Sequence, residues 1–435
     1  MEEKGTAFKL NNGEVAVGFD LTDTYSQISI ASMDSDQVET LAAVAGSSNY
    51  RIPTALFKRK EVNQWFAGRE AIRNRDNGQD GFFVDGLLER GAVGGEIKVG
   101  EESYSASALI ALFMKRTMSL VSMMVPLNKI VSFTVTVDNL DNRLIGVLSE
   151  AVASLGLKTQ NIFFQSHMES FYCYNIYQDI NLWEKNVLLI DFSGEYVKSY
   201  RMECNKNTTP IVAFIDPNSY PHFETAGLDE MLPDSEEAKA ADARLLKLVE
   251  DSAEGRLFSA IYFIGENFKQ QIFKESVRYM CRKGRVFEGN NLYSKGAAYS
   301  AKDRLQRTII SESHVFLGND KLKSNVGINV IRHGENSYMA LLDAGVNWFE
   351  AKNQCEVILD KGNKLSFVIT PLTGKNPEVV EITLFDLPKR PPKTSRLGLS
   401  LSMLSETSLQ VEVKDLGFGE IFPASEIEWK EVINV

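Results

Sequence analysis

Two aspartates that each end an apolar stretch are the residues of this chain best suited to chemistry. Asp20 follows "EVAVGF" and Asp191 follows "NVLLI", and each is followed by a short polar turn and a second strand-like stretch. In a hairpin of this kind, backbone N–H groups of the turn can hold a phosphate. The pattern predicts two such hairpins, provided that their turns leave room for the anion.

The turn residues argue against a phosphate. Asp23 lies in the first turn, and Glu195 and Tyr196 follow Gly194 in the second. A carboxylate about 4 Å from a phosphate charge costs about 4 kcal/mol at an effective dielectric of 20. We therefore predict that Asp23, Glu195 and Tyr196 take the space of the phosphate. The alternative is that these side chains point outward as solvated turn residues.

Composition limits the class of protein. The chain has 435 residues, 44% of them hydrophobic and 24% charged, as expected for a soluble protein of two to four domains. Its net charge of −11 argues against nucleic acid as a partner. The four Cys and four His are scattered, which predicts neither disulfides nor a metal site.

We expect a cytoplasmic protein without a membrane segment. The start "MEEKGTAFKL" lacks the apolar core of a signal peptide. The apolar stretch "ALIALFMKRTMSLVSMMV" is interrupted by Lys115 and Arg116 and fits an amphipathic helix.

Strands and helices alternate along the first part of the chain, which predicts an α/β fold with some parallel strand pairing. The two hairpins align on Asp20 and Asp191, so we expect two similar lobes with a cleft between them. The predicted elements are a hairpin at 14–32, helices at 106–125, 142–156 and 170–179, strands at 129–138 and 160–166, and a hairpin from 186.

After about residue 305 the pattern changes to seven short alternating strands, which predicts an all-β sandwich. We therefore divide the chain into a bilobal domain at 1–305 and a β domain at 306–435. The first lobe comprises about 1–182 with a helix at 290–305, and the second comprises about 183–289.

The order of motifs resembles the actin-like ATPase superfamily, and specifically the seventy-kilodalton heat-shock chaperones of the DnaK type. "GFDLTDTYSQISI" and "LLIDFSGEYVKSY" are similar to the two phosphate hairpins of that family, "YFIGENFK" to its adenosine loop, and "YSKGAAYSA" to its Gly-Ala-Ala helix. The tail from "VGINVI" resembles its β-sandwich peptide-binding domain. The resemblance spans nearly the whole chain.

The resemblance implies which residues would remain from a nucleotide site. Asp20 and Asp191 are the catalytic remnants. Lys269 stands where the family has an Arg that stacks on adenine, and Asn267 replaces a Ser of the same loop. The full set of implied cofactor-binding residues is Thr24, Ser26, Gly194, Gly265, Asn267, Lys269 and Gly296.

Several departures from the family weaken the expected chemistry. "DGLLERG" at 85–91 has no Lys where the family has its phosphate-contacting Lys. Ser166 in "QSHM" replaces the Glu that positions the attacking water, although the nearby Glu169 leaves the register open. The segments at 58–105 and 205–260 are short, and the family's helical lid is missing. Because each lost catalytic group costs roughly a hundredfold in rate, we expect ATP hydrolysis to be lost.

Three hypotheses follow. The first is a chaperone-like pseudo-ATPase scaffold that binds a protein or peptide through its β domain and needs no cofactor. The second is a genuine ATPase that binds ATP or ADP with Mg²⁺, using Asp20, Asp23, Asp191 and Glu195 as a metal-bridged site. The third is a sugar-kinase-like enzyme with Asp138 as general base.

Overall fold

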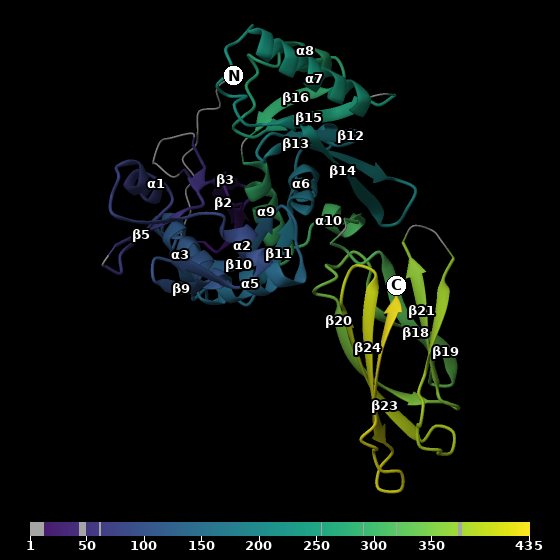
Figure 1. Ribbon diagram of the computed structural model, residues 1–435. Coiled ribbons are helices and arrows are strands. Elements are labelled where there is room, and N and C mark those ends of the chain that lie inside the picture. Colours follow the sequence, from purple (N-terminus) through teal and green to yellow (C-terminus); the bar gives the residue numbers. More distant parts are fainter. Residues whose placement is uncertain are drawn as a thin grey trace. The chain divides into compact units, whose positions relative to one another are not determined.

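The computed structural model describes residues 13–42, 49–60, 62–253, 255–289, 291–318, 320–372 and 376–435. Their contacts divide the chain into two compact units, Met1–Val315 and Phe316–Val435 (Figure 1). The first unit is mixed α/β and the second consists of strands, as the sequence predicts. The short helix α10 (Ile309–Ser313) belongs to the first unit, so the division lies after the predicted residue 305.

The first sheet of the α/β unit has the order β11-β10-β1-β2-β3, and β4 also pairs with β2. β1 is parallel to β10, and β10 is parallel to β11, whereas β1 and β2 form an antiparallel hairpin. Every residue of β1 is buried, which explains its almost uninterrupted apolar sequence. The strands are β1 (Val15–Leu21), β2 (Tyr25–Ser32), β3 (Val38–Thr40), β4 (Ile52–Pro53), β10 (Ile130–Val137) and β11 (Ile162–Ser166).

The second sheet has the order β16-β15-β12-β13-β14-β17. Here β12 is antiparallel to β13 and parallel to β15, and β15 is parallel to β16. The five consecutive strands β16-β15-β12-β13-β14 therefore repeat the arrangement of the first sheet. The strands are β12 (Asn186–Asp191), β13 (Tyr196–Asn205), β14 (Ile211–Glu224), β15 (Phe258–Ile264), β16 (Arg285–Gly289) and β17 (His314–Phe316).

Two helices cover one face of the second sheet. Figure 1 shows α7 (Glu236–Ala253) and α8 (Lys274–Cys281) next to this sheet, and their apolar faces share a core with its strands. Phe192, which directly follows β12, is fully buried in this core and contacts the rings of Phe223, Phe268 and Phe273. The packing of Phe192 thereby holds the start of the β12–β13 hairpin against this core.

Helices α6 (His167–Ile176) and α9 (Leu292–Asp303) pack closely together and against the first sheet. A Cβ atom on Gly296 would lie 1.9 Å from the carbonyl oxygen of Ser170, and one on Gly18 would lie 2.3 Å from the amide of Ala298. Both glycines therefore permit close packing. Gly296, one of the residues implied to bind a cofactor, packs against α6 and does not line the pocket described below.

The first unit also contains smaller elements. They comprise a small sheet of β5 (Leu56–Arg59), β6 (Trp65–Ala67) and β7 (Gly81–Val84), and a pair formed by β8 (Glu96–Val99) and β9 (Glu102–Ser105). The helices are α1 (Arg69–Asp76), α2 (Leu87–Val93), α3 (Ala106–Thr117), α4 (Ser119–Met124) and α5 (Asn142–Ala153), with short 3-10 turns at Leu127–Lys129 and Ile180–Leu182.

Within the described residues, Ala106–Met124 is the one helical stretch long and apolar enough to cross a membrane. Core helices of soluble proteins have the same length and composition. Ile110 and Phe113 of α3 are fully buried in the unit, which fits a core helix. The predicted amphipathic helix is thus present at the predicted place.

The second unit contains two four-stranded antiparallel sheets, with orders β19-β18-β21-β22 and β20-β23-β24-β25. Side chains of both sheets share one apolar core that includes Val326, Phe367, Leu399 and Val411. The strands are β18 (Ser324–Arg332), β19 (Glu335–Leu342), β20 (Lys352–Leu359), β21 (Lys364–Pro371), β22 (Glu378–Thr383), β23 (Ser395–Met403), β24 (Ser408–Gly417) and β25 (Glu428–Asn434).

The strand β25 was not among the seven predicted strands. It lies at a sheet edge and carries Glu428, Lys430 and Glu431, and of its residues only Ile433 is buried. An edge strand with charged side chains lacks the apolar alternation by which strands are recognised.

Candidate functional site

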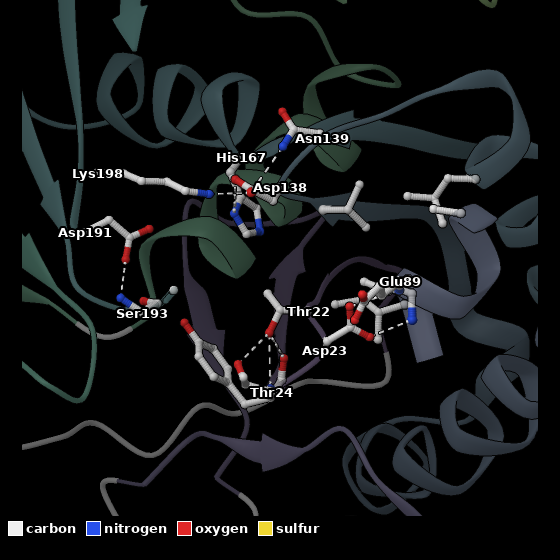
Figure 2. A pocket seen from close by; sticks show the side chains of 17 residues that line it. Thr22, Asp23, Thr24, Glu89, Asp138, Asn139, His167, Asp191, Ser193 and Lys198 are labelled. Atoms are coloured by element: carbon white, nitrogen blue, oxygen red, sulfur yellow. Dashed lines mark hydrogen bonds and ion pairs between the residues drawn. The ribbon is translucent and has the colours of Figure 1, made fainter. Parts of the chain in front are cut away.

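A pocket of about 320 Å³ lies in the first unit, where the hairpin β1–β2 faces the hairpin β12–β13 (Figure 2). Its size is at the lower end of the range for small-molecule sites. It is lined by Leu21, Thr22, Asp23, Thr24, Tyr25, Leu88, Glu89, Ala92, Val137, Asp138, Asn139, Leu144, His167, Asp191, Ser193, Gly194 and Lys198. The two aspartate-ended hairpins are therefore brought together, as their alignment predicts.

Asp20 is fully buried beside the pocket and is paired with a histidine. The Nε2 atom of His167 lies 2.8 Å from Oδ1 of Asp20. The other carboxylate oxygen, Oδ2, is buried without a hydrogen-bond partner among the described residues. His167 begins helix α6, directly after β11, and this position brings its ring to the carboxyl ends of β1 and β10.

Asp138 is the second acidic group of the pocket, at the end of β10. Its Oδ2 atom accepts a hydrogen bond from Nζ of Lys198 at 2.5 Å, and its Oδ1 atom lies 3.4 Å from the hydroxyl of Tyr200. Lys198 and Tyr200 both come from β13 of the second sheet. The pair of Asp138 and Lys198 therefore joins the two sheets across the pocket.

Asp191 is held by two donors of its own chain. The amide of Ser193 donates to Oδ1 at 2.7 Å, and the hydroxyl of Tyr293 donates to Oδ2 at 2.7 Å. The ring of Tyr293 is stacked on that of His167, with centroids 3.9 Å apart. Tyr293 on α9 thus connects the two buried aspartates, Asp191 directly and Asp20 through the histidine.

The electrostatics follow from burial and from these pairs. Burial opposes the charged form of His167, but the carboxylates of Asp20, Asp138 and Asp191 outweigh it and raise the pKa of the imidazole. Burial raises the pKa of Asp20, an effect that His167 only partly offsets. Burial also acts to raise the pKa of Asp138, but His167 and Lys198 outweigh it and lower that pKa.

Asp23 does not occupy a phosphate position. Its Oδ1 atom accepts a hydrogen bond from the amide of Leu88 at 2.6 Å, and its Oδ2 atom accepts one from Glu89 at 3.0 Å. The carboxylate therefore binds the first turn of α2, which Figure 2 shows beside Glu89. The hydroxyl of Thr22 closes its own turn by donating to the carbonyl of Tyr25 at 2.7 Å.

Glu195 and Tyr196 do not fill the pocket either. Glu195 is exposed, Tyr196 is half-buried, and neither lines the pocket. The prediction that they replace the phosphate is therefore wrong. The alternative, in which they are turn residues directed away from the site, agrees with the structure.

Of the residues implied to bind a cofactor, Thr24 and Gly194 line the pocket. Ser26 does not: its hydroxyl is buried 2.8 Å from that of Thr54. The side chain of Lys269 is exposed at the surface.

Gly265 and Asn267 support the second hairpin from behind. Gly265 has a φ of +105°, and a Cβ atom there would lie 2.4 Å from the carbonyl carbon of Phe192. Asn267 donates from Nδ2 to the carbonyl oxygen of Phe192 at 3.1 Å. Both residues thus hold the backbone directly before Ser193.

The residues around "QSHM" also have structural partners. The hydroxyl of Ser166 accepts a hydrogen bond from the amide of Glu169 at 3.3 Å and caps α6. Glu169 forms an ion pair with Arg304 at 3.5 Å. Neither of them lines the pocket, whereas His167, which directly follows Ser166, does.

The sequence reasoning missed His167, Lys198 and Tyr293 as site residues. Lys198 stands between the buried Val197 and Ser199 of β13, so the alternation of the strand could have indicated that its side chain lies on the opposite face from theirs. His167 lies directly after a strand that ends next to that of Asp138. The contact of Tyr293 with Asp191 had no sequence signal, because 102 residues separate them.

Within the described parts of the chain, no group of three or more His, Cys, Asp or Glu side chains has the arrangement of a metal site. Asp23 binds α2, and Glu195 points away from the pocket. The four acids of the metal-bridged hypothesis therefore do not come together.

Comparison with known proteins gives two matches that follow the two units. Residues 321–435 match a domain of unknown function, DUF8552. No curated protein matches the chain. Residues 37–319 match the C-terminal part of a family of unknown function, DUF5716, and since this match covers more than half of the sequence, the chain belongs to that family.

Proposed function

We propose that this protein is a chaperone-like scaffold with a duplicated, actin-like α/β unit whose nucleotide site no longer turns over ATP. The strands β11-β10-β1-β2-β3 of the first sheet and β16-β15-β12-β13-β14 of the second have the same order and directions, which supports the duplication. The pairing of the two aspartate-ended hairpins across one pocket supports an ancestral nucleotide cleft.

One observation carries the loss of turnover: each of the three aspartates at the cleft is bound by a side chain of the protein itself. Asp20 has His167, Asp138 has Lys198, and Asp191 has Tyr293. A phosphate with its metal ion would have to displace these partners or bind among unpaired acids. Phosphoryl transfer needs cations placed on the phosphate oxygens and a group that orients the attacking water. Lys198 is the only Lys that lines the pocket among the described residues, and it is already paired with Asp138.

The cleft is also joined at a second place. Arg51, before β4, pairs with Glu266, after β15, at 3.1 Å, and its guanidinium lies over the ring of Tyr25. Glu266 belongs to the segment that resembles an adenosine loop. The two sheets are thus connected by two ion pairs, Arg51 with Glu266 and Lys198 with Asp138, without any nucleotide.

The β unit provides the partner site in this proposal. Strand β22 is a sheet edge, and its Val379 side chain is 62% exposed. Edge strands offer unpaired N–H and C=O groups to an extended peptide, which can add as a further strand. The partner is accordingly an extended protein segment.

The nucleotide part is tested by titrating the protein with ATP and ADP, each with and without Mg²⁺, while following the melting temperature and phosphate release. We expect no shift and no release. A ligand at a hundredfold over its dissociation constant would add about 2.7 kcal/mol to stability. Phosphate release in proportion to protein would overturn the proposal in favour of a genuine ATPase.

The peptide part is tested with a library of extended heptapeptides and the variant Val379→Lys. Because this side chain is exposed, the variant should fold normally, while its charge at the edge should weaken peptide binding at least tenfold. Val432→Lys at the edge strand β25 is the matched control, since Val432 is 55% exposed on the other sheet. Equal peptide binding by the unmodified protein, Val379→Lys and Val432→Lys would exclude β22 as the binding edge.

A further inference from the structure

The pocket has two chemically different ends. Its more apolar end is formed by Leu21 and Val137 at the ends of β1 and β10, by Leu88 and Ala92 on α2, and by Leu144 on α5. The carboxylates of Asp23 and Glu89 lie beside α2 at this end, at the edge of the apolar wall (Figure 2). Its polar end lies toward the second sheet and contains Asp138, Asp191 and Lys198, as Figure 2 shows. A pocket of this kind takes a ligand with an apolar body and one directed polar group.

The charges that line the pocket favour a cation. Four acids line it, Asp23, Glu89, Asp138 and Asp191, against Lys198 and His167. Both basic groups are already used, since Lys198 pairs with Asp138 and His167 with the buried Asp20. An anionic ligand would therefore meet an excess of negative charge, and a cationic one would relieve it.

The acceptors for such a cation are at the polar end. The Asp138 side chain remains 40% exposed beside Lys198, and it lies opposite the second hairpin. Each oxygen of Asp191 accepts one hydrogen bond and retains capacity for another. The carboxylate of Asp23 accepts hydrogen bonds from the first turn of α2, so it contributes negative charge to the pocket and no direct contact with the ammonium group.

We propose that the pocket binds a small primary amine with an apolar body, whose ammonium group contacts Asp138 and Asp191 and whose hydrocarbon part packs against α2 and α5. This amine site lies in the same cleft as the proposed lost nucleotide site. It depends on the proposed function in one respect, because a bound phosphate group would occupy its polar end. The ligand class is set by the residues of the pocket and does not depend on the partner of the β unit.

The experiment compares isosteric probes on the full chain near neutral pH by titration calorimetry. The probes are pentylammonium, pentan-1-ol and pentanoate, with methylammonium as the amine that lacks an apolar body. We expect saturable binding of pentylammonium, at least tenfold weaker binding of pentanol and methylammonium, and none of pentanoate. Equal affinity for pentanol, or binding of pentanoate, would overturn the proposal.

Two variants locate the site. Asp138→Asn keeps the shape of the side chain and should weaken pentylammonium binding at least tenfold. Ala92→Leu should fill the apolar end, and since Ala92 is only half-buried, the unit should still fold. The control Asp34→Asn removes an exposed acid that does not line the pocket and should leave binding unchanged.

Unchanged binding in both Asp138→Asn and Ala92→Leu would exclude this pocket as the amine site. The leucine methyl signals of the protein provide a readout of the apolar end, because Leu21, Leu88 and Leu144 should shift on addition of the amine. The ATP titration is read separately. ATP hydrolysis without amine binding contradicts both proposals, whereas the absence of both hydrolysis and amine binding contradicts only this one.

Discussion

Two buried acids of this molecule, Asp20 in the α/β unit and Asp415 in the β unit, have opposite surroundings. Both oxygens of Asp415 are fully used: Arg390 donates to each at 2.7 Å, and the amides of Gly417 and Ser425 donate at 3.0 and 2.9 Å. Asp20 has His167 on one oxygen and no partner among the described residues on the other.

The difference appears in the pKa directions. Burial acts to raise the pKa of Asp415, but the hydrogen bonds from Arg390, Ser425 and Gly417 outweigh it and lower that pKa strongly. For Asp20 burial prevails, and the pKa is raised. A structural ion pair satisfies its charges, whereas an incompletely satisfied buried charge is typical of a functional cleft. Of the two buried acids, Asp20 is thus the less completely satisfied.

The largest effect is expected for Arg390→Ala. The variant leaves the carboxylate of Asp415 buried without its cation, which costs about 3–5 kcal/mol. Urea unfolding, followed by hydrogen exchange in peptides of residues 316–435, measures the loss in this unit. The control is Lys364→Ala, which breaks an exposed pair with Glu381 and should cost less than about 1 kcal/mol. Equal costs of the two variants would contradict a structural role of the buried pair.

A smaller effect is expected for Asp20→Asn. Because Asp20 already lacks one partner, replacing its charge by an amide should cost only about 1–3 kcal/mol in the α/β unit. Hydrogen exchange within residues 13–42 and 130–166 follows this unit. A cost as large as that of Arg390→Ala would mean that the two acids are equally well satisfied.

The two units should also differ in their pH dependence. The pKa of His167 is raised in the folded state. Its contribution to the free energy of unfolding is therefore complete below about pH 6.5, and it is lost as the pH rises through the higher pKa of the folded state. The pKa of Asp415 is lowered, so its contribution is present above about pH 3.9 and is lost as the pH falls through its folded value.

Raising the pH from neutrality should therefore destabilise the α/β unit and leave the β unit unaffected, and strong acid should weaken the contribution of Asp415 in the β unit. Hydrogen exchange at several pH values measures the stability of both units in one sample. The variant His167→Gln should remove part of the alkaline slope of the α/β unit. A slope unchanged by this substitution would exclude His167 as its source.

The smallest effect on stability is expected for Lys198→Met. The pair of Lys198 with Asp138 is half-exposed, with side-chain exposures of 31% and 40%, so its loss should cost at most about 1 kcal/mol. Denaturant unfolding measures this cost. A cost of several kcal/mol would mean that the cross-cleft pair is as structural as that of Arg390.

Much of the fold could be predicted from local pattern. The hairpin at Asp20, the strand before Asp138 and seven of the eight β-unit strands have clear apolar periodicity. The site could be predicted only in part. The sequence showed that Asp20 and Asp191 end similar strands, but not which side chains form hydrogen bonds with them. Asp23 illustrates the reason, because its partners are amides 65 and 66 residues away in the segment 85–91, and nothing in the sequence of that segment shows that it faces the first hairpin.

The close packing of α9 determines when the N-terminal sheet can be completed. This helix is formed by residues 292–303, yet it covers β1 and β2 near the start of the chain, with Gly18 directly against Ala298. A ribosome-bound chain that ends before α9 would expose the apolar face that this helix later covers. Folding of the first sheet must therefore await synthesis of the second, and the early strands are open to aggregation or to chaperone binding until then.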